Sequence, residues 1–125
     1  MKYDPLTPPD PREWLDLDEM ERIIIVEEYH NRKKIDLPNA QLHATFHVIV
    51  ENQVAMGVLA VINALKRLQN EGLDRHQAIH AIGTVLADNI FAVLQGGMGA
   101  DAESESEYFE KLDKLTAESF LKMQG

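Results

Sequence analysis

Proline divides the chain into segments of different character. Four of the five prolines lie within the first fourteen residues, where a fixed φ and a missing N–H donor favour extended backbone, and the fifth is Pro38. We therefore expect an extended arm over residues 1–15, pinned to the core by Trp14 and Leu15, and a linker over residues 35–38. Elsewhere apolar residues recur at helical spacing, and no stretch alternates with period two for long enough to indicate a sheet. The predicted fold class is all-α, a four- to five-helix bundle with a proline-rich N-terminal arm.

Capping residues and glycines set the ends of the expected helices. Asp16 and Glu19 have the spacing of a capping box at the start of the first helix, Gly57 breaks or kinks the chain, and Asp74 is an N-cap. An acidic, solvated loop is expected over residues 97–107. The expected helices cover residues 17–33, 40–56, 58–70, 75–94 and 107–123.

Composition excludes several classes of protein. A chain of 125 residues fits a single domain, and the absence of cysteine removes thiolate-bound zinc, iron–sulfur clusters and thiol nucleophiles. The net charge is −9, and no basic run exceeds Arg32-Lys33-Lys34, so we expect neither nucleic acid nor a membrane as a partner. The N-terminal residues lack the apolar core of a signal peptide, which predicts a cytoplasmic location.

Four of the five histidines occur in two H-x-x-x-H pairs. His43 and His47 form one pair, which continues to Glu51 as H-x-x-x-H-x-x-x-E. His76 and His80 form the other. A random arrangement of five histidines in this chain would contain about 0.2 such pairs. Residues four apart on a helix lie on one face about one turn apart, so each pair can converge on one ion.

The fifth histidine ends an E-x-x-H sequence in the first expected helix. Imidazole and carboxylate together suit zinc, iron, manganese or nickel, and the apolar neighbours of the histidines indicate a dry interior where an unpaired imidazole is costly. We therefore predict a metal site between three helices. The candidate ligands are His30, His43, His47, Glu51, His76 and His80, with Glu27 as a further carboxylate. The competing interpretation is a buried polar network in which carboxylates orient the imidazoles by hydrogen bonds.

Two stretches carry these motifs, L-H-A-T-F-H-V-I-V-E-N-Q at residues 42–53 and R-H-Q-A-I-H-A-I-G at residues 75–83. In them the chain resembles a bacterial helical family of unknown function. Its members are similar in length and have an L-H-x-x-x-H-x-x-x-E-x-Q helix followed by an H-x-x-x-H helix. The resemblance covers most of the first four expected helices. It implies a helical fold and no particular activity.

The order of the motifs is also similar to that of hemerythrin-like di-iron bundles. Those carry a histidine on the first helix, H-x-x-x-E on the second, H-x-x-x-H on the third and H-x-x-x-x-D on the fourth. Here the first three motifs begin at His30, His47 and His76, and no histidine remains for the fourth. The ligand set implied by this resemblance is therefore incomplete. A dinuclear site would need His43 and Glu27 as replacements, whereas a mononuclear site fits the sequence equally well.

Two functional hypotheses follow. The first is a non-haem metal site, mono- or dinuclear; with iron, which we favour, it would bind or reduce O₂ or a related oxidant with Glu51 as a bridging carboxylate. With zinc, the same residues would activate water. The sequence contains no H-E-x-x-H, G-x-S-x-G or G-x-x-x-x-G-K-[ST], so common hydrolase and nucleotide-binding signatures are absent and no catalytic residue is assigned.

The second hypothesis is a helical interaction module in which a histidine network or a structural zinc ion only stabilises the fold. Residues 58–70 hold more apolar side chains than one intramolecular face needs, so they form either ordinary core or a homodimer face. The N-terminal arm supplies no candidate ligand. Deletion of residues 1–10 is therefore expected to leave metal binding intact and to change stability only modestly.

Overall fold

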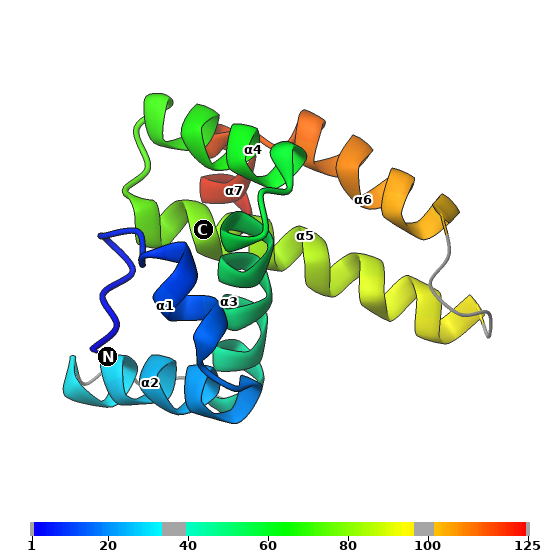
Figure 1. Cartoon of the computed structure of the whole chain (residues 1–125). Helices are drawn as coiled ribbons and strands as arrows, with labels where there is room; N and C mark the ends of the chain where they lie inside the picture. The colour runs from blue at the N-terminus through cyan, green and yellow to red at the C-terminus, as the bar shows by residue number, and fades with distance from the viewer. Residues whose placement is uncertain (1, 34–39, 97–101, 125) are drawn as a thin grey trace.

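A computed structural model describes residues 2–33, 40–96 and 102–124, and these residues form seven α-helices and no strand (Figure 1). The helices are α1 (Pro11–Asp16), α2 (Glu19–Arg32), α3 (Ala40–Ala55), α4 (Leu59–Asn70), α5 (Arg75–Gly96), α6 (Ala102–Lys114) and α7 (Ala117–Gln124). The predicted all-α class is confirmed, while the described helices outnumber the four or five expected. The linker predicted over residues 35–38 lies outside the described residues.

A short helix interrupts the N-terminal arm. The Asp10 carboxylate accepts hydrogen bonds from the backbone N–H groups of Arg12 and Glu13, and so caps α1. Pro11 occupies the first helical position, where its missing N–H costs nothing. The prediction of an extended segment over residues 1–15 is therefore wrong from Pro11 onward, because the last proline of the run begins a helix.

The second helix begins two residues later than predicted. Leu17 is extended, with φ −74° and ψ 147°, and ends α1. Asp18 then caps α2, and its carboxylate accepts a hydrogen bond from the Glu21 N–H at 2.8 Å. The side chain of Glu21 completes the capping box at the Asp18 N–H. The predicted cap, Asp16, is instead the last residue of α1.

Two glycines with positive φ turn the chain between the central helices. Gly57 has φ 81° and lies between α3 and α4, which are bent by 108° relative to each other. Gly72 has φ 111° and lies between α4 and α5. Only glycine adopts this region without strain, so both turns depend on it. Asp74 caps α5 as predicted, since its carboxylate accepts a hydrogen bond from the Gln77 N–H at 2.8 Å.

The C-terminal region differs most from prediction. The loop expected over residues 97–107 is helical from residue 102 onward, where α6 begins, and residues 97–101 lie outside the described part. Acidic side chains are favourable in the first turns of a helix, so the same composition suits either structure. The single helix expected over residues 107–123 is divided into α6 and α7, because Thr116 accepts a hydrogen bond from the Ser119 N–H at 3.0 Å and caps α7.

Buried apolar side chains form two clusters, and residues of α3 belong to both. The larger joins α3 to α4, α5, α6 and α7 around residues such as Leu68 and Ile82. The smaller joins the N-terminal segment, α1 and α2 to α3, and contains Tyr3 and Trp14. Trp14 is fully buried, as expected of the residue that anchors the arm, whereas Leu15 is 40% exposed. Helix α3 is therefore the element through which the two halves of the core are joined.

The apolar side chains of α4 mostly belong to the larger cluster. Val61, Leu65 and Leu68 are buried, and Leu59 is 70% exposed. The homodimer face stays a prediction. No single described helix is long and apolar enough to cross a membrane; α3 and α4 reach that length and hydropathy only together, across their bend.

Candidate metal centre

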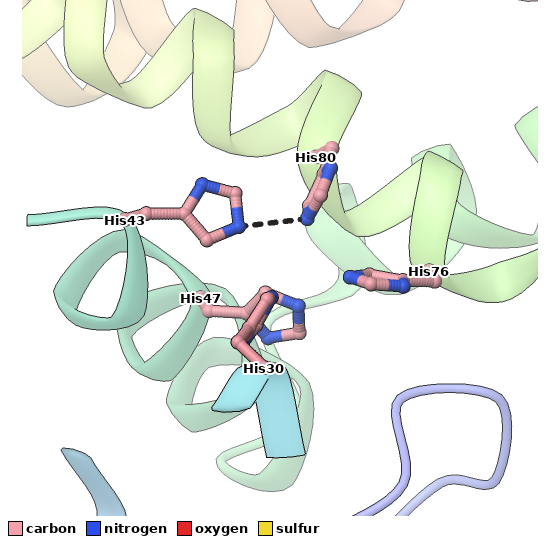
Figure 2. A group of neighbouring side chains, drawn as sticks. All are labelled: His30, His43, His47, His76 and His80. Atoms are coloured by element: carbon pink, nitrogen blue, oxygen red, sulfur yellow. Dashed lines mark hydrogen bonds between the residues drawn. The ribbon is translucent and has the colours of Figure 1, made fainter. Parts of the chain in front are cut away.

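All five histidines come together in one group (Figure 2). His30 lies in the last turn of α2, His43 and His47 lie on α3, and His76 and His80 lie on α5. One ring nitrogen from each residue can be chosen such that the five atoms all lie within 4.8 Å of one another. The group is therefore assembled from three helices at the place where α2 and α5 both contact α3.

Helical spacing explains why the two histidines of each pair lie close together, and packing between helices explains the position of His30. The two members of each pair are one turn apart, and their ring centroids are 5.8 Å apart on α3 and 4.3 Å apart on α5. The ring of His30 packs against both pairs, with its centroid 4.9–6.4 Å from those of the other four rings. Tyr29 packs edge-on against His30 and His76, with centroid separations of 5.2 and 5.5 Å.

Hydrogen bonds assign the protonated nitrogen in two of the rings. His30 Nδ1–H donates to the Val26 carbonyl oxygen at 2.9 Å, because a carbonyl can only accept. The Tyr3 hydroxyl donates its single proton to Glu51 Oε2 at 2.5 Å, so its oxygen accepts from His47 Nδ1–H at 2.9 Å. In both rings Nδ1 therefore carries a proton, and the neutral form of such an imidazole has its lone pair on Nε2.

Three buried nitrogens at the centre of the group have no hydrogen-bond partner. They are Nε2 of His30, His47 and His76. The remaining two, His43 Nε2 and His80 Nε2, lie 2.9 Å from each other. Buried polar atoms are nearly always partnered, so three unpartnered ring nitrogens within one group of five histidines require an explanation. A transition-metal ion bound by those nitrogens supplies one, and the histidine group can hold such an ion.

The electrostatics keep the rings in the form that binds metal. Burial, with repulsion from neighbouring imidazolium groups, lowers the pKa of His43 to about 4 and that of His80 to about 3. The same causes lower the pKa of His47 and of His76 below the ordinary value. These four rings are therefore neutral at pH 7, and neutral imidazole is the ligand.

Glu51 is buried beside the group and is paired with another residue. It lies one turn after His47 on α3 and is 1% exposed. Its Oε2 accepts a hydrogen bond from Arg75 Nη1 at 2.8 Å, and its Oε1 accepts one from Arg75 Nη2 at 2.8 Å. The group of candidate ligand atoms within 4.8 Å of one another contains the five histidines and no carboxylate oxygen of Glu51 or Glu27. The structure thus brings together the five predicted histidines and leaves both predicted carboxylates outside their group.

Sequence reasoning missed two residues that lie beside the group. Tyr3 reaches His47 and Glu51 from the N-terminal segment, and Arg75 pairs with Glu51 while donating to the Pro5 carbonyl at 2.9 Å. Burial, together with the nearby Glu51 carboxylate, raises the pKa of Tyr3, so the hydroxyl keeps its proton. The sequence contains one indication of the role of Arg75. A basic side chain at the first position of a helix is unfavourable next to the positive end of the helix dipole, which indicates that it pairs with an acidic group in another part of the chain.

A cavity of about 300 Å³ adjoins one side of the group. His43, His47 and His80 line it together with Phe46, Ile79, Gly83 and Thr84. The Thr84 hydroxyl donates to the His80 carbonyl at 3.0 Å and so is already in use. Gly83 widens the space, since a Cβ built there would lie 3.9 Å from the Phe46 Cβ. A small molecule in this cavity would meet imidazole nitrogens on one side and apolar groups on the other.

Comparison with known proteins finds no matching family model, no matching curated protein and no matching solved structure. The two resemblances described from the sequence therefore stay predictions. What is known of the site comes from its own residues.

Proposed function

We propose that the protein binds one transition-metal ion through the Nε2 atoms of its five histidines. The observations that carry this proposal are the convergence of one ring nitrogen from each of the five histidines and the three buried, unpartnered Nε2 atoms among them. In a purely hydrogen-bonded network, each of these three would cost about 1–3 kcal/mol as an unsatisfied buried group. Only His43 and His80 satisfy each other without a metal. The network interpretation therefore leaves most of the group unexplained.

The size of the group favours one ion over two. A metal–imidazole bond is about 2.1 Å long, so two nitrogens on opposite sides of one ion are about 4.2 Å apart. A group of five nitrogens within 4.8 Å of one another is close to that limit. Two ions about 3.5–4 Å apart would need donors spread over a greater distance. We therefore favour a mononuclear centre over the di-iron alternative.

The number of donors bears on the identity of the ion. Imidazole nitrogen suits zinc, copper, iron and nickel. Structural zinc is almost always four-coordinate, so it would leave one of these five histidines unused. An ion with six positions would use all five and keep one for a ligand from the cavity. Iron binds imidazole nitrogen and can have six coordination positions, so it is our preferred metal, with zinc as the alternative.

The cavity suggests what reaches such an ion. Phe46 and Ile79 make part of its wall apolar, and no charged side chain lines it among the described residues. A space of about 300 Å³ admits a small molecule. When bound, iron would supply the binding or reduction of O₂ or a related oxidant. His43 and His80, which are partly exposed beside the cavity, would hold the ion on that side.

Metal analysis of the untagged protein tests the proposal directly. The purified chain is titrated with Fe²⁺ under anaerobic conditions, and separately with Zn²⁺, and the bound metal is counted after removal of excess. We expect one equivalent in the unaltered chain and loss of tight binding in His30→Ala. Glu27→Gln is the matched control, because it also lies on α2 and its carboxylate is outside the group. Two tightly bound equivalents, or none, would refute the mononuclear centre.

A further inference from the structure

We propose that Tyr3 is a positioning residue of the metal centre, and that the segment comprising residues 2–5 completes the site. This inference rests on the proposed function, because it concerns how one ligand of that centre is held. It assigns a role to a segment that contains no ligand. It also reverses the expectation from the sequence that the arm is dispensable for metal binding.

Tyr3 is held in place on several sides. It is 2% exposed, and its ring lies with centroids 5.7 Å from Trp14, 6.1 Å from Tyr29 and 5.4 Å from His47. The His47 contact is edge-on, with the planes at 88°. The ring is thus a packed part of the smaller core cluster. Its hydroxyl is consequently fixed relative to His47.

A chain of hydrogen bonds leads from Arg75 to the His47 ring. Arg75 donates to both oxygens of Glu51, and Tyr3 donates to Oε2 of the same carboxylate. With its proton committed to Glu51, the Tyr3 oxygen can only accept from His47 Nδ1–H. That acceptance selects the tautomer of His47 whose Nε2 carries a lone pair. The ring is therefore oriented with its lone pair toward the other four histidines.

The segment is tied down at a second point. Arg75 Nη1 donates to the Pro5 carbonyl at 2.9 Å, so the same guanidinium holds both the carboxylate and the backbone of the segment. A metal ion on Nε2 would make Nδ1–H a stronger donor and so strengthen its bond to Tyr3. Because coupling between two binding events is reciprocal, docking of Tyr3 would strengthen metal binding to the same extent.

Tyr3→Phe tests the role of the hydroxyl while keeping the ring. We expect the affinity for Co²⁺, measured by competition with a chelating dye, to fall by about 10–100-fold, the usual effect of losing an outer hydrogen bond to a metal-bound histidine. The visible absorption of bound Co²⁺ should also shift, because the field of the His47 ligand changes. Tyr29→Phe is the matched control: its ring packs against the same group, and we expect neither effect.

A second measurement on the unaltered chain keeps the test independent of how well the variant folds. In the Zn²⁺-loaded protein with ring-¹⁵N histidine, we expect a slowly exchanging Nδ1–H of His47 with a through-space contact to the Tyr3 ring. Equal Co²⁺ affinity and absorption in Tyr3→Phe, or no such contact, would overturn this inference and leave the proposed function standing. Failure of the unaltered chain to bind Co²⁺ or Zn²⁺ would overturn both.

Discussion

The ion pair between Arg75 and Glu51 makes a strong prediction about stability. Arg75 is 5% exposed and Glu51 1% exposed, and two hydrogen bonds of 2.8 Å join them. The variant Arg75→Met keeps an unbranched side chain of similar length and removes the charge. Glu51 then keeps Tyr3 as a donor and has lost its counter-ion. The Pro5 carbonyl loses its donor as well.

The expected cost is large. Removing one partner of a buried ion pair costs about 3–5 kcal/mol, because the other charge stays buried without compensation. A domain of ordinary stability has about 5–15 kcal/mol in total. Arg75→Met should therefore remove about a fifth or more of the free energy of unfolding. Arg75→Lys, which keeps the charge and loses the paired geometry, should cost less.

Urea unfolding of the metal-free chain, followed by far-UV circular dichroism, measures the effect. The double variant Glu51→Leu/Arg75→Met should recover most of the loss, since replacing both members of a buried pair by apolar groups is often neutral. Lys122→Met is the surface control, because Lys122 pairs with Glu118 at 3.3 Å while both side chains are more than three-quarters exposed. A loss below about 1 kcal/mol in Arg75→Met would refute the reasoning.

Three further predictions concern the histidines and the cavity. His47→Ala and His80→Ala should each abolish tight metal binding with most of the helical circular dichroism retained; full metal occupancy in both would show that neither is a ligand. In the metal-free chain, burial depresses the pKa values of His43 and His80, so only the unfolded state gains protons at these residues as the pH falls from about 6.5 toward 4. The free energy of unfolding should therefore decrease across that window, by at most about 1.4 kcal/mol per pH unit for each ring. The decrease should be smaller for His43, which is partly solvated. Thermal unfolding at pH 7 and pH 5, with and without a chelator, checks this, and a midpoint indifferent to chelator at pH 7 contradicts the metal site. Gly83→Ala should stabilise α5 by about 0.5–1 kcal/mol, because its Cβ fits beside Phe46, whereas Gly83→Leu should fill the cavity and slow reaction of the Fe²⁺-loaded protein with O₂; a Gly83→Leu variant that reacts as fast as Gly83→Ala would show that the cavity is not the route.

Helical periodicity explains why the histidine group was predictable from the sequence. A spacing of four residues places His43 with His47, and His76 with His80, on shared faces whatever the rest of the chain does. The same periodicity also places Glu51 one turn after His47, but it does not predict that the Glu51 carboxylate is bonded to Arg75. The partners that determine what Glu51 does are 24 and 48 residues away in the chain, at Arg75 and Tyr3. No local pattern encodes such a pairing.

The differences in the fold have local physical causes. Proline both favours extended backbone and suits the first position of a helix, so the run ending at Pro11 fits an arm or the start of α1 equally. Acidic residues likewise suit a solvated loop and the first turns of a helix, so composition alone did not predict that α6 begins at Ala102. Tertiary contacts, which composition does not contain, decide both cases.

The charge of the donor set has a consequence for redox chemistry. Within the described part of the chain, the five candidate donors are imidazole rings, which bring no negative charge to a metal ion, and the buried carboxylate of Glu51 is already paired with Arg75. A bound cation would therefore keep its whole charge in a largely buried setting, and each additional positive charge would be more costly there. Net charge around a metal is one of the main determinants of its reduction potential. This centre would thus favour the lower oxidation state of iron, and of the two proposed reactions with O₂ it would suit binding better than reduction.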